Sequence, residues 1–232
     1  MAAGSLYLSG MSPSRIEDNF ISRLQGFQPE KHGATRALCL YSAAIALSDA
    51  GCLRAAQNAS RRFGATARQL YETMLQSYLF LGFPRMLAAA EMLAGNNYVP
   101  EAGETAIAEI KTGPEDWQKR GRELCRRVYQ GNYEALRSKV EAMAPEVFYW
   151  MELEGYGKVL SRPGLDIIDR ELAVVACLLM ENRPVQLHSH LRGALNVGAS
   201  RELVRDVLAD VGPIAPERYA DAQAVIERLR LS

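Results

Sequence analysis

The sequence lacks several features that would assign it to a functional class at once. Its 27 basic residues are balanced by 27 acidic ones, so no net charge favours nucleic acid or an anionic membrane surface as a partner. No uncharged apolar run is long enough to span a bilayer, and no basic stretch followed by a long apolar run marks a signal peptide. We therefore expect a cytoplasmic protein without a membrane or nucleic-acid partner.

Cysteine is scarce and is not paired. The cysteines are Cys39, Cys52, Cys125 and Cys177, and no two of them have Cys-x-x-Cys spacing. This spacing excludes a zinc knuckle and a dithiol redox motif. We interpret the four residues as buried free thiols in a reducing compartment.

Histidine is also scarce, and its positions do not predict a metal site. His32 is isolated in the sequence and is expected to be solvated. His188 and His190 lie two residues apart on an expected helix. At ~100° per residue their side chains point about 160° apart around the helix axis. Two diverging imidazoles without paired thiolates do not form a zinc site, so no metal is expected.

The pattern that is present is helical throughout. Ala, Leu, Arg and Glu dominate, and no segment shows convincing period-two alternation, which predicts an all-α fold. Thr66 and Gln69 fit a capping box at the start of a helix, and Gly64 fits the end of the preceding one. Residues 93–117 are rich in Gly, Asn and Pro and are expected to connect two halves, with no more than one short helix.

The helix signals occur twice. Gly198 and Ser200 repeat Gly64 and Thr66 at an offset of 134 residues. The residues that coincide at this offset include Arg36 with Arg170, Leu38 with Leu172, Leu53 with Leu187 and Ala65 with Ala199. We interpret the pattern as an ancient duplication, with one copy in residues 1–110 and the other in 111–232. A chance likeness between two Ala- and Leu-rich hairpins is the alternative.

Two helical stretches are expected ahead of the second set of repeat signals. They contain an aromatic cluster, formed by Phe148, Tyr149, Trp150 and Tyr156. We interpret this cluster as core or subunit interface rather than as part of a ligand site.

A helix pair in the second half carries the candidate chemistry. Asp166 is expected to cap its first helix and Asn182 its second, with Pro184 in the first turn of the latter. Glu171 and His190 each lie at the margin of an apolar stripe on these consecutive antiparallel helices, so a carboxylate–imidazole contact beside a partly buried cavity is allowed. The carboxylate would orient the imidazole for acid–base chemistry. A polar pair at the rim of the helices, without catalysis, is the alternative.

The motifs between residues 162 and 208 follow a distinctive order. A Gly-Leu-Asp lead-in precedes an Arg-Glu-Leu helix start, a Gln-Leu-x-x-His-x-x-Gly-Ala-x-x-x-Gly run and a Ser-capped helix. Together they resemble the carboxymuconolactone decarboxylase family. The similarity spans roughly residues 117–208, and residues 33–84 resemble a divergent second copy. The resemblance implies duplicated helical hairpins of the alkylhydroperoxidase-D-like type, whose helices pack across subunits in trimers or hexamers.

Two activities are associated with this family. One branch decarboxylates 4-carboxymuconolactone, and the alkylhydroperoxidase-D branch reduces peroxides through a Cys-x-x-Cys, with a Glu and a His as proton relay. Glu171 and His190 keep the nineteen-residue spacing of that relay, but Arg183 and Gln186 stand at the cysteine positions. Because neither can act as a redox nucleophile, a peroxidase-like antioxidant role is disfavoured.

The resemblance thus implies decarboxylation or proton transfer, without a cofactor, on a small carboxylated lactone or a related acid. His190 is expected to be the general acid and Glu171 its orienting partner. The expected substrate-binding groups are Arg183, Gln186, His188 and Arg192.

The first copy suggests a different possibility. At the repeat offset, Ala37 stands at the position of Glu171 and Ala56 at that of His190. The first copy is therefore expected to be scaffold, which leaves at most one active-type site per chain. A non-catalytic oligomeric binding or scaffold protein is the alternative to an enzyme.

Overall fold

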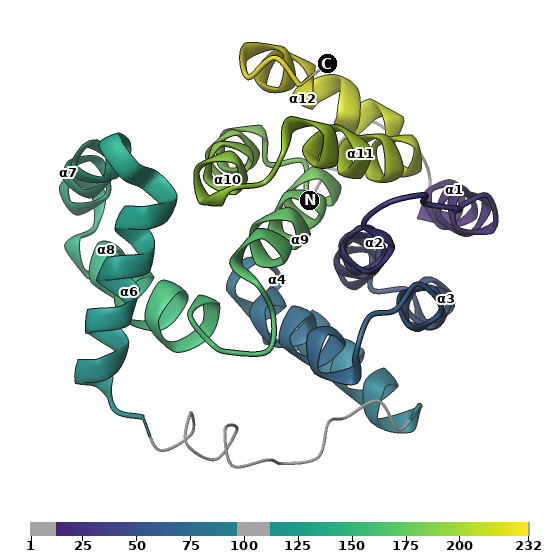
Figure 1. Ribbon diagram of the computed structural model, residues 1–232, viewed down its shortest axis with the longest axis horizontal. Helices are drawn as coiled ribbons and strands as arrows, with labels where there is room; N and C mark the ends of the chain where they lie inside the picture. Colours follow the sequence, from purple (N-terminus) through teal and green to yellow (C-terminus); the bar gives the residue numbers. More distant parts are fainter. Residues whose placement is uncertain (1–12, 97–111, 232) are drawn as a thin grey trace, which may run out of the picture.

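The computed structural model describes residues 13–96 and 112–231, and every regular element in these two ranges is a helix (Figure 1). The expected all-α fold is confirmed. Most of the expected connection, from residue 97 to 111, lies outside the described residues. In the part of the chain that the structure describes, no helix combines the length and apolar character needed to cross a membrane.

The helices fall into three consecutive groups. The first group contains α1 (Pro13–Gln25), α2 (Gly33–Leu47), α3 (Ala50–Arg62) and α4 (Ala67–Gly95). The second contains α6 (Pro114–Tyr129), η1 (Gln130–Asn132), α7 (Tyr133–Met143), α8 (Pro145–Trp150) and the π-helix η2 (Met151–Leu160). The third contains α9 (Ile167–Met180), α10 (Pro184–Val197), α11 (Arg201–Val211), η3 (Gly212–Ile214) and α12 (Pro216–Arg228). The second group has more helices than the two stretches that the sequence predicts.

The first and third groups repeat each other closely. α2, α3 and α4 begin at residues 33, 50 and 67, each 134 residues before the start of α9, α10 and α11. The turns repeat as well, because Ser48 and Asn182 both have positive φ, of 59° and 50°. Gly64 and Gly198 also share positive φ, of 93° and 114°. Left-handed residues at matching positions support duplication over chance similarity.

Side-chain caps fix several of the helix starts. Thr66 Oγ1 accepts from the Gln69 amide at 3.1 Å, and Gln69 Oε1 accepts from the Thr66 amide at 2.9 Å, which completes the expected capping box. The Asp166 side chain accepts from the backbone N–H of Ile168 at 2.9 Å, as predicted. These starts follow from local sequence alone.

The expected Asn182 cap is wrong. Asn182 adopts the left-handed conformation in the turn before α10, and its side chain donates to Asp221 Oδ2 on α12 at 2.8 Å. Arg183 occupies the N-cap position without a side-chain hydrogen bond. Asn182 therefore tolerates positive φ and ties the turn to α12 instead of capping α10.

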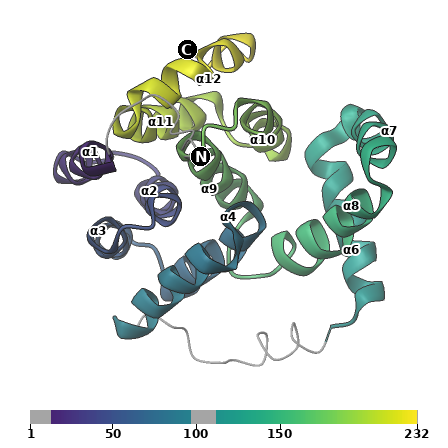
Figure 2. The same ribbon diagram turned by 180° about the vertical axis from the view of Figure 1, so that it is seen from behind.

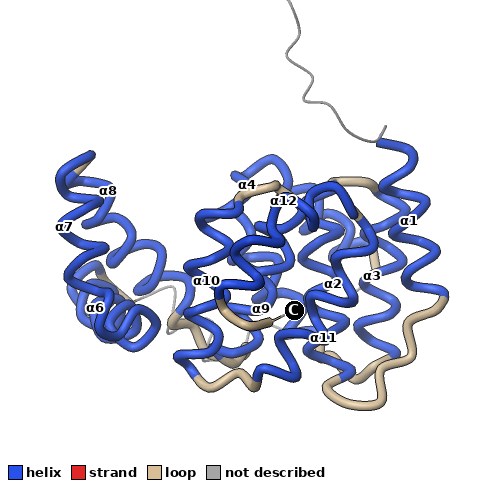
Figure 3. The backbone as a smooth tube through the Cα atoms, turned by 90° about the horizontal axis from the view of Figure 1, so that it is seen from above, coloured by secondary structure: helices blue, strands red, loops and turns tan. Residues whose placement is uncertain are grey.

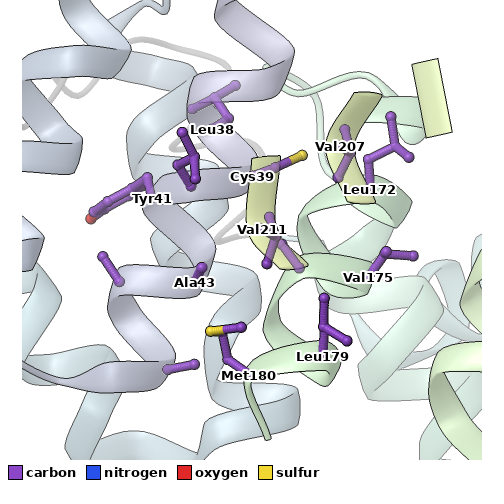
Figure 4. Close-up of a cluster of buried hydrophobic side chains, with 14 of the residues drawn as sticks. Leu38, Cys39, Tyr41, Ala43, Leu172, Val175, Leu179, Met180, Val207 and Val211 are labelled. Carbon is purple, nitrogen blue, oxygen red and sulfur yellow. The ribbon is translucent and has the colours of Figure 1, made fainter. Parts of the chain in front are cut away.

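The main core forms where α2, α9 and α11 meet, as seen from the front in Figure 1 and from behind in Figure 2. Figure 4 shows the Cys39 side chain of α2 pointing toward Val207 of α11 and Leu172 of α9. From residue 37 to 46, every residue of α2 is buried, whichever side of the helix it occupies. A helix that is covered on all sides must lie inside the fold, and α2 does.

Polar contacts between the two halves also correspond to each other at the offset of 134 residues. Arg36 Nη1 contacts Asp206 Oδ2 at 3.3 Å, and the equivalent pair, Arg170 Nη2 and Glu72 Oε2, lies at 3.0 Å. Thr35 and Asp169 are each other's counterparts, and the Thr35 hydroxyl donates to Asp169 at 2.7 Å. Contacts exchanged in this reciprocal way are those of a twofold dimer, here built within one chain.

The buried contact between Arg170 and Glu72 is the centre of a larger network of ion pairs and hydrogen bonds. Arg170 and Glu72 both have fully buried side chains. The Glu72 carboxylate also contacts Arg162 Nε at 3.0 Å and Arg68 Nη2 at 2.8 Å, while Arg170 Nη1 donates to Gln76 Oε1 at 3.2 Å. The single Glu72 carboxylate thus contacts three guanidinium groups near the start of α9.

The second group of helices stands beside this body, as Figures 1 and 3 show, and has a small core of its own. α6 and η2 approach closely enough for their backbones to touch. A Cβ on Gly121 would lie 1.8 Å from the Glu152 carbonyl oxygen, and one on Gly157 would lie 1.9 Å from that of Trp117. Only glycine fits at either position. α6 also packs on α10, and η2 on α4, so this group covers one side of the candidate helix pair.

Candidate functional site

Glu171 and His190 form a buried pair between α9 and α10. His190 Nδ1 lies 2.9 Å from Glu171 Oε2, so the contact that helix geometry allows is present. The Glu171 side chain is fully buried and that of His190 is 9% exposed. Glu171 Oε1 has no hydrogen-bond partner among the described residues. The carboxylate therefore holds the ring through Nδ1 and leaves Nε2 for other partners.

Gly193 makes room for this pair. A Cβ at this position would lie 2.6 Å from Glu171 Oε2 and 2.8 Å from Val128 Cγ1. Any larger residue would have to displace the carboxylate or the packing of α6 on α10. The glycine in the sequence motif thus has a steric role one turn after His190.

His190 lines a cavity of about 250 Å³ between the body and the second group of helices. Its walls come from α4, α6, α8, η2 and α10, and are formed by Leu79, Phe80, Tyr129, Val147, Trp150, Met151, Glu154, Gly155, Tyr156, Leu160 and His190. The Phe80 ring meets the imidazole edge-on, with ring centroids 5.4 Å apart. A largely apolar cavity with a few polar groups is typical of a small-molecule site.

Two tyrosines line this cavity. The Tyr129 and Tyr156 rings meet edge to face, with centroids 6.0 Å apart. Burial is the main cause that raises the pKa of each hydroxyl, and the nearby charge of Glu171 adds to it. Both therefore stay protonated and can act only as neutral hydrogen-bond donors or acceptors.

The aromatic cluster has two buried members, as expected of core residues, and two exposed members, as a subunit interface would require. Phe148 and Tyr156 are buried, but Trp150 is 56% exposed and Tyr149 is 51% exposed. Trp150 and Tyr156 line the cavity. Local sequence does not reveal this, because the cavity is enclosed by five helices that come from different parts of the chain.

The expected substrate-binding groups do not gather around His190. Arg183 and Gln186 are exposed at the start of α10 and do not line the cavity. His188 and Arg192 line a different cleft on the other side of α10. Among the described residues, no Lys or Arg side chain lines the His190 cavity, whereas Glu154 does.

The first copy has no equivalent of the pair. Ala37 and Ala56 are completely buried in the core, at the positions that correspond to Glu171 and His190. Elsewhere, His32 is exposed at the start of α2, as expected. Within residues 13–96 and 112–231, no three His, Cys, Asp or Glu side chains are grouped so that they could hold a metal ion.

Substituting Ala for Gly193 is expected to disturb the pair directly. The added methyl group should displace Glu171 and lower the free energy of unfolding by about 1–3 kcal/mol. Gly95→Ala is the matched control, because a Cβ there meets no atom within 4 Å. Thermal denaturation checks both variants, and equal stability of the two would contradict the steric role.

The four thiols are expected to be unreactive in the folded protein. All are buried and free, as predicted, and burial raises the pKa of Cys52 and of Cys125 to about 12. Burial also raises the pKa of Cys39 and of Cys177. A disulfide reagent at about pH 8 should modify them only after unfolding, because the thiolate is the reacting form. A thiol that reacts rapidly in the folded chain would restore the case for peroxidase chemistry.

Comparisons with known proteins agree with the resemblance. The family model described as "Carboxymuconolactone decarboxylase family" matches residues 32–94 and 145–225, one region in each half and together more than half of the chain. A curated relative, "Peroxisomal protein 2" of Schizosaccharomyces pombe, is 29% identical over 140 residues. That alignment covers 59% of this chain and 63% of the relative.

Proposed function

The chain belongs to the carboxymuconolactone decarboxylase family as a tandem two-copy member without a Cys-x-x-Cys, and on this basis we propose that it is a cofactor-independent acid–base enzyme. Its substrate would be a small carboxylated lactone or a related acid, and its reaction decarboxylation or proton transfer. The observation that carries the proposal is the 2.9 Å contact between His190 Nδ1 and Glu171 Oε2 at the wall of an apolar cavity.

In the proposed decarboxylation, the bond between the substrate carbon and its carboxylate breaks and CO₂ leaves. The electron pair passes into a dienolate, and His190 Nε2–H donates a proton to carbon. Glu171 stabilises the imidazolium before this transfer and fixes the ring through Nδ1. The imidazole then regains its proton from solvent, so the reaction consumes one proton and releases one CO₂.

The apolar cavity supports the same chemistry in two ways. A carboxylate that loses its hydration there is destabilised, whereas the dienolate disperses its charge. The neutral hydroxyls of Tyr129 and Tyr156 are proposed donors to the developing oxyanion. Hydrogen-bond donors would thus take the place of the cation that the cavity lining lacks.

The test is turnover of 4-carboxymuconolactone by the purified chain, followed by loss of its absorbance. Wild type should convert it, and His190→Gln should be slower by about 10²–10⁴-fold. Turnover that survives both His190→Ala and Glu171→Gln would contradict the assigned site. No turnover by wild type would contradict the substrate.

A non-catalytic small-molecule-binding protein is the second candidate. The lack of a lining Lys or Arg and the alanines at the first copy's positions favour it. Binding of the lactone to the cavity without its conversion would identify this function. A peroxidase-like role is disfavoured by the buried thiols and by Arg183 and Gln186 at the redox positions.

We also propose that the chain forms a trimer or hexamer. Large apolar side chains are exposed on two helices that lie close to the cavity: Phe83 and Leu87 on α4, and Val147, Tyr149 and Trp150 on α8. In such an assembly, the exposed Arg183 and Gln186 could bind a substrate held by a neighbouring copy. Light scattering that gives a monomer would contradict the assembly.

The compartment is a separate proposal. The sequence favours the cytoplasm, whereas the name of the Schizosaccharomyces pombe relative places that protein in the peroxisome. Fractionation of cells that express the chain would decide between the two compartments.

A further inference from the structure

A second cleft lies on the side of α10 that faces away from the His190 cavity. It has a volume of about 220 Å³ and is formed by the end of α6, by α7 and by α10. Tyr129 lines both this cleft and the His190 cavity, so its ring forms part of the wall between them. The cleft uses His188 and Arg192 but neither member of the Glu171–His190 pair.

The cleft carries positive charge that nothing in it balances. Lys139 and Arg192 line it, and neither forms an ion pair with any described residue. None of its lining residues is acidic. The acidic side chains of α7, Glu134 and Glu141, pair instead with Arg126 and Arg137. Two unneutralised cations in one concave surface favour an anionic ligand.

The cleft also contains the His188 imidazole, whose protonated form a bound anion would stabilise. Its Nε2 is shielded from solvent and has no hydrogen-bond partner within the part of the chain that the structure describes. Burial is the main cause that lowers the pKa of this ring, and the charges of Arg192 and Arg228 add to the effect. A bound anion would oppose both charges and so favour the protonated imidazolium.

The remaining surface of the cleft indicates what kind of anion would fit. Val128, Ala135 and Leu136 form an apolar wall, and Asn132 and Ser189 supply neutral polar groups. Inorganic phosphate would leave the apolar wall unused. A ligand with a carboxylate at one end and a short apolar body would match both parts.

We propose that this cleft is a binding site for a small organic carboxylate, separate from the His190 cavity. The carboxylate contacts Arg192 and Lys139, and the apolar body lies against Val128 and Leu136. The site stands independently of the proposed enzyme activity, because it rests on different residues and predicts binding rather than turnover.

The chain's three histidines make nuclear magnetic resonance a direct test. Histidine-labelled protein is titrated with benzoate as the probe, and each resonance is assigned with a His→Gln variant. Benzoate should raise the pKa of His188 by about one pH unit, and the resonance of His32, which is exposed at the N-cap position of α2, should not shift. Arg192→Gln and Lys139→Gln should each weaken benzoate binding by about tenfold or more.

Arg127→Gln is the matched control, since Arg127 is exposed on α6 and lines neither the cleft nor the cavity. It should bind benzoate like wild type. A benzoate response at His190 without one at His188, equal weakening by Arg127→Gln, or tighter binding of inorganic phosphate than of benzoate would each overturn the assignment. Failure of lactone turnover alone would leave the result at His188 unaffected, so the two proposals are tested separately.

Discussion

Glu171→Gln is expected to reduce turnover of the lactone by about 10²–10⁴-fold while the chain stays folded. The amide occupies nearly the same space as the carboxylate but carries no charge. It cannot stabilise the imidazolium, and its N–H₂ group can reverse the hydrogen bond to His190 Nδ1 and so change the tautomer. Steady-state kinetics should show the loss chiefly in kcat, because Glu171 acts through His190 and does not line the cavity.

Glu154→Gln is the matched control for this prediction. Glu154 lines the same cavity, but its carboxylate accepts from the Tyr78 hydroxyl at 2.9 Å and lies 3.6 Å from Lys158 Nζ, with no contact to His190. Its loss should change kcat by only a few-fold. Equal loss from the two variants would mean that the total charge of the cavity, rather than the oriented imidazole, controls the reaction.

Arg170→Leu is expected to destabilise the chain by about 3 kcal/mol, a fall of about 10 °C in the midpoint of thermal unfolding. Its guanidinium is fully buried, and four acceptors surround it: the Glu72 carboxylate, the Gln76 amide oxygen and two backbone carbonyls. Without the Arg170 guanidinium, the buried Glu72 carboxylate keeps only Arg162 and Arg68 as charged partners among the described residues, and both are partly exposed. Breaking a buried pair costs more than the pair's net contribution, and here the carboxylate loses a charged partner that is as fully buried as itself.

Two further variants separate this effect from a loss of packing. Arg36→Leu removes the equivalent guanidinium, which is 14% exposed and whose partner Asp210 keeps Arg23. It should therefore destabilise less. The double variant Arg170→Leu with Glu72→Leu should recover part of the loss, because it removes the fully buried carboxylate, and the guanidiniums that then lose it, Arg162 and Arg68, are partly exposed to water. If the double variant is as unstable as the sum of its parts, packing and not charge explains the effect.

The repeat and most helix boundaries could be predicted because their causes are local. Capping residues such as Thr66 and Asp166 act within three positions of themselves, so a single sequence reveals them. The offset is equally visible, since a duplicated chain repeats its glycine stops. Where a turn residue had a distant partner, as Asn182 has in Asp221, the local interpretation was wrong.

The pair at the candidate site was also within reach of the sequence. Glu171 and His190 lie on consecutive helices joined by a short turn, and helix geometry decides which faces meet. The cavity beside them could not be predicted from the sequence, because five helices from different parts of the chain enclose it. Trp150 and Tyr156 lacked any local signal of their role.

The sequence by itself determined the all-α fold, the duplication, the family and the residues that form the buried pair. The fold and the pair follow from periodicity, capping and spacing within a few helical turns, the duplication from the repeat offset, and the family from the resemblance of ordered motifs. Only the tertiary structure decided which side chains share a cavity with His190, and it separated Arg183 and Gln186 from it. It also placed Arg170 on Glu72, 98 residues away. Such contacts depend on how whole helices pack, which a single sequence does not specify.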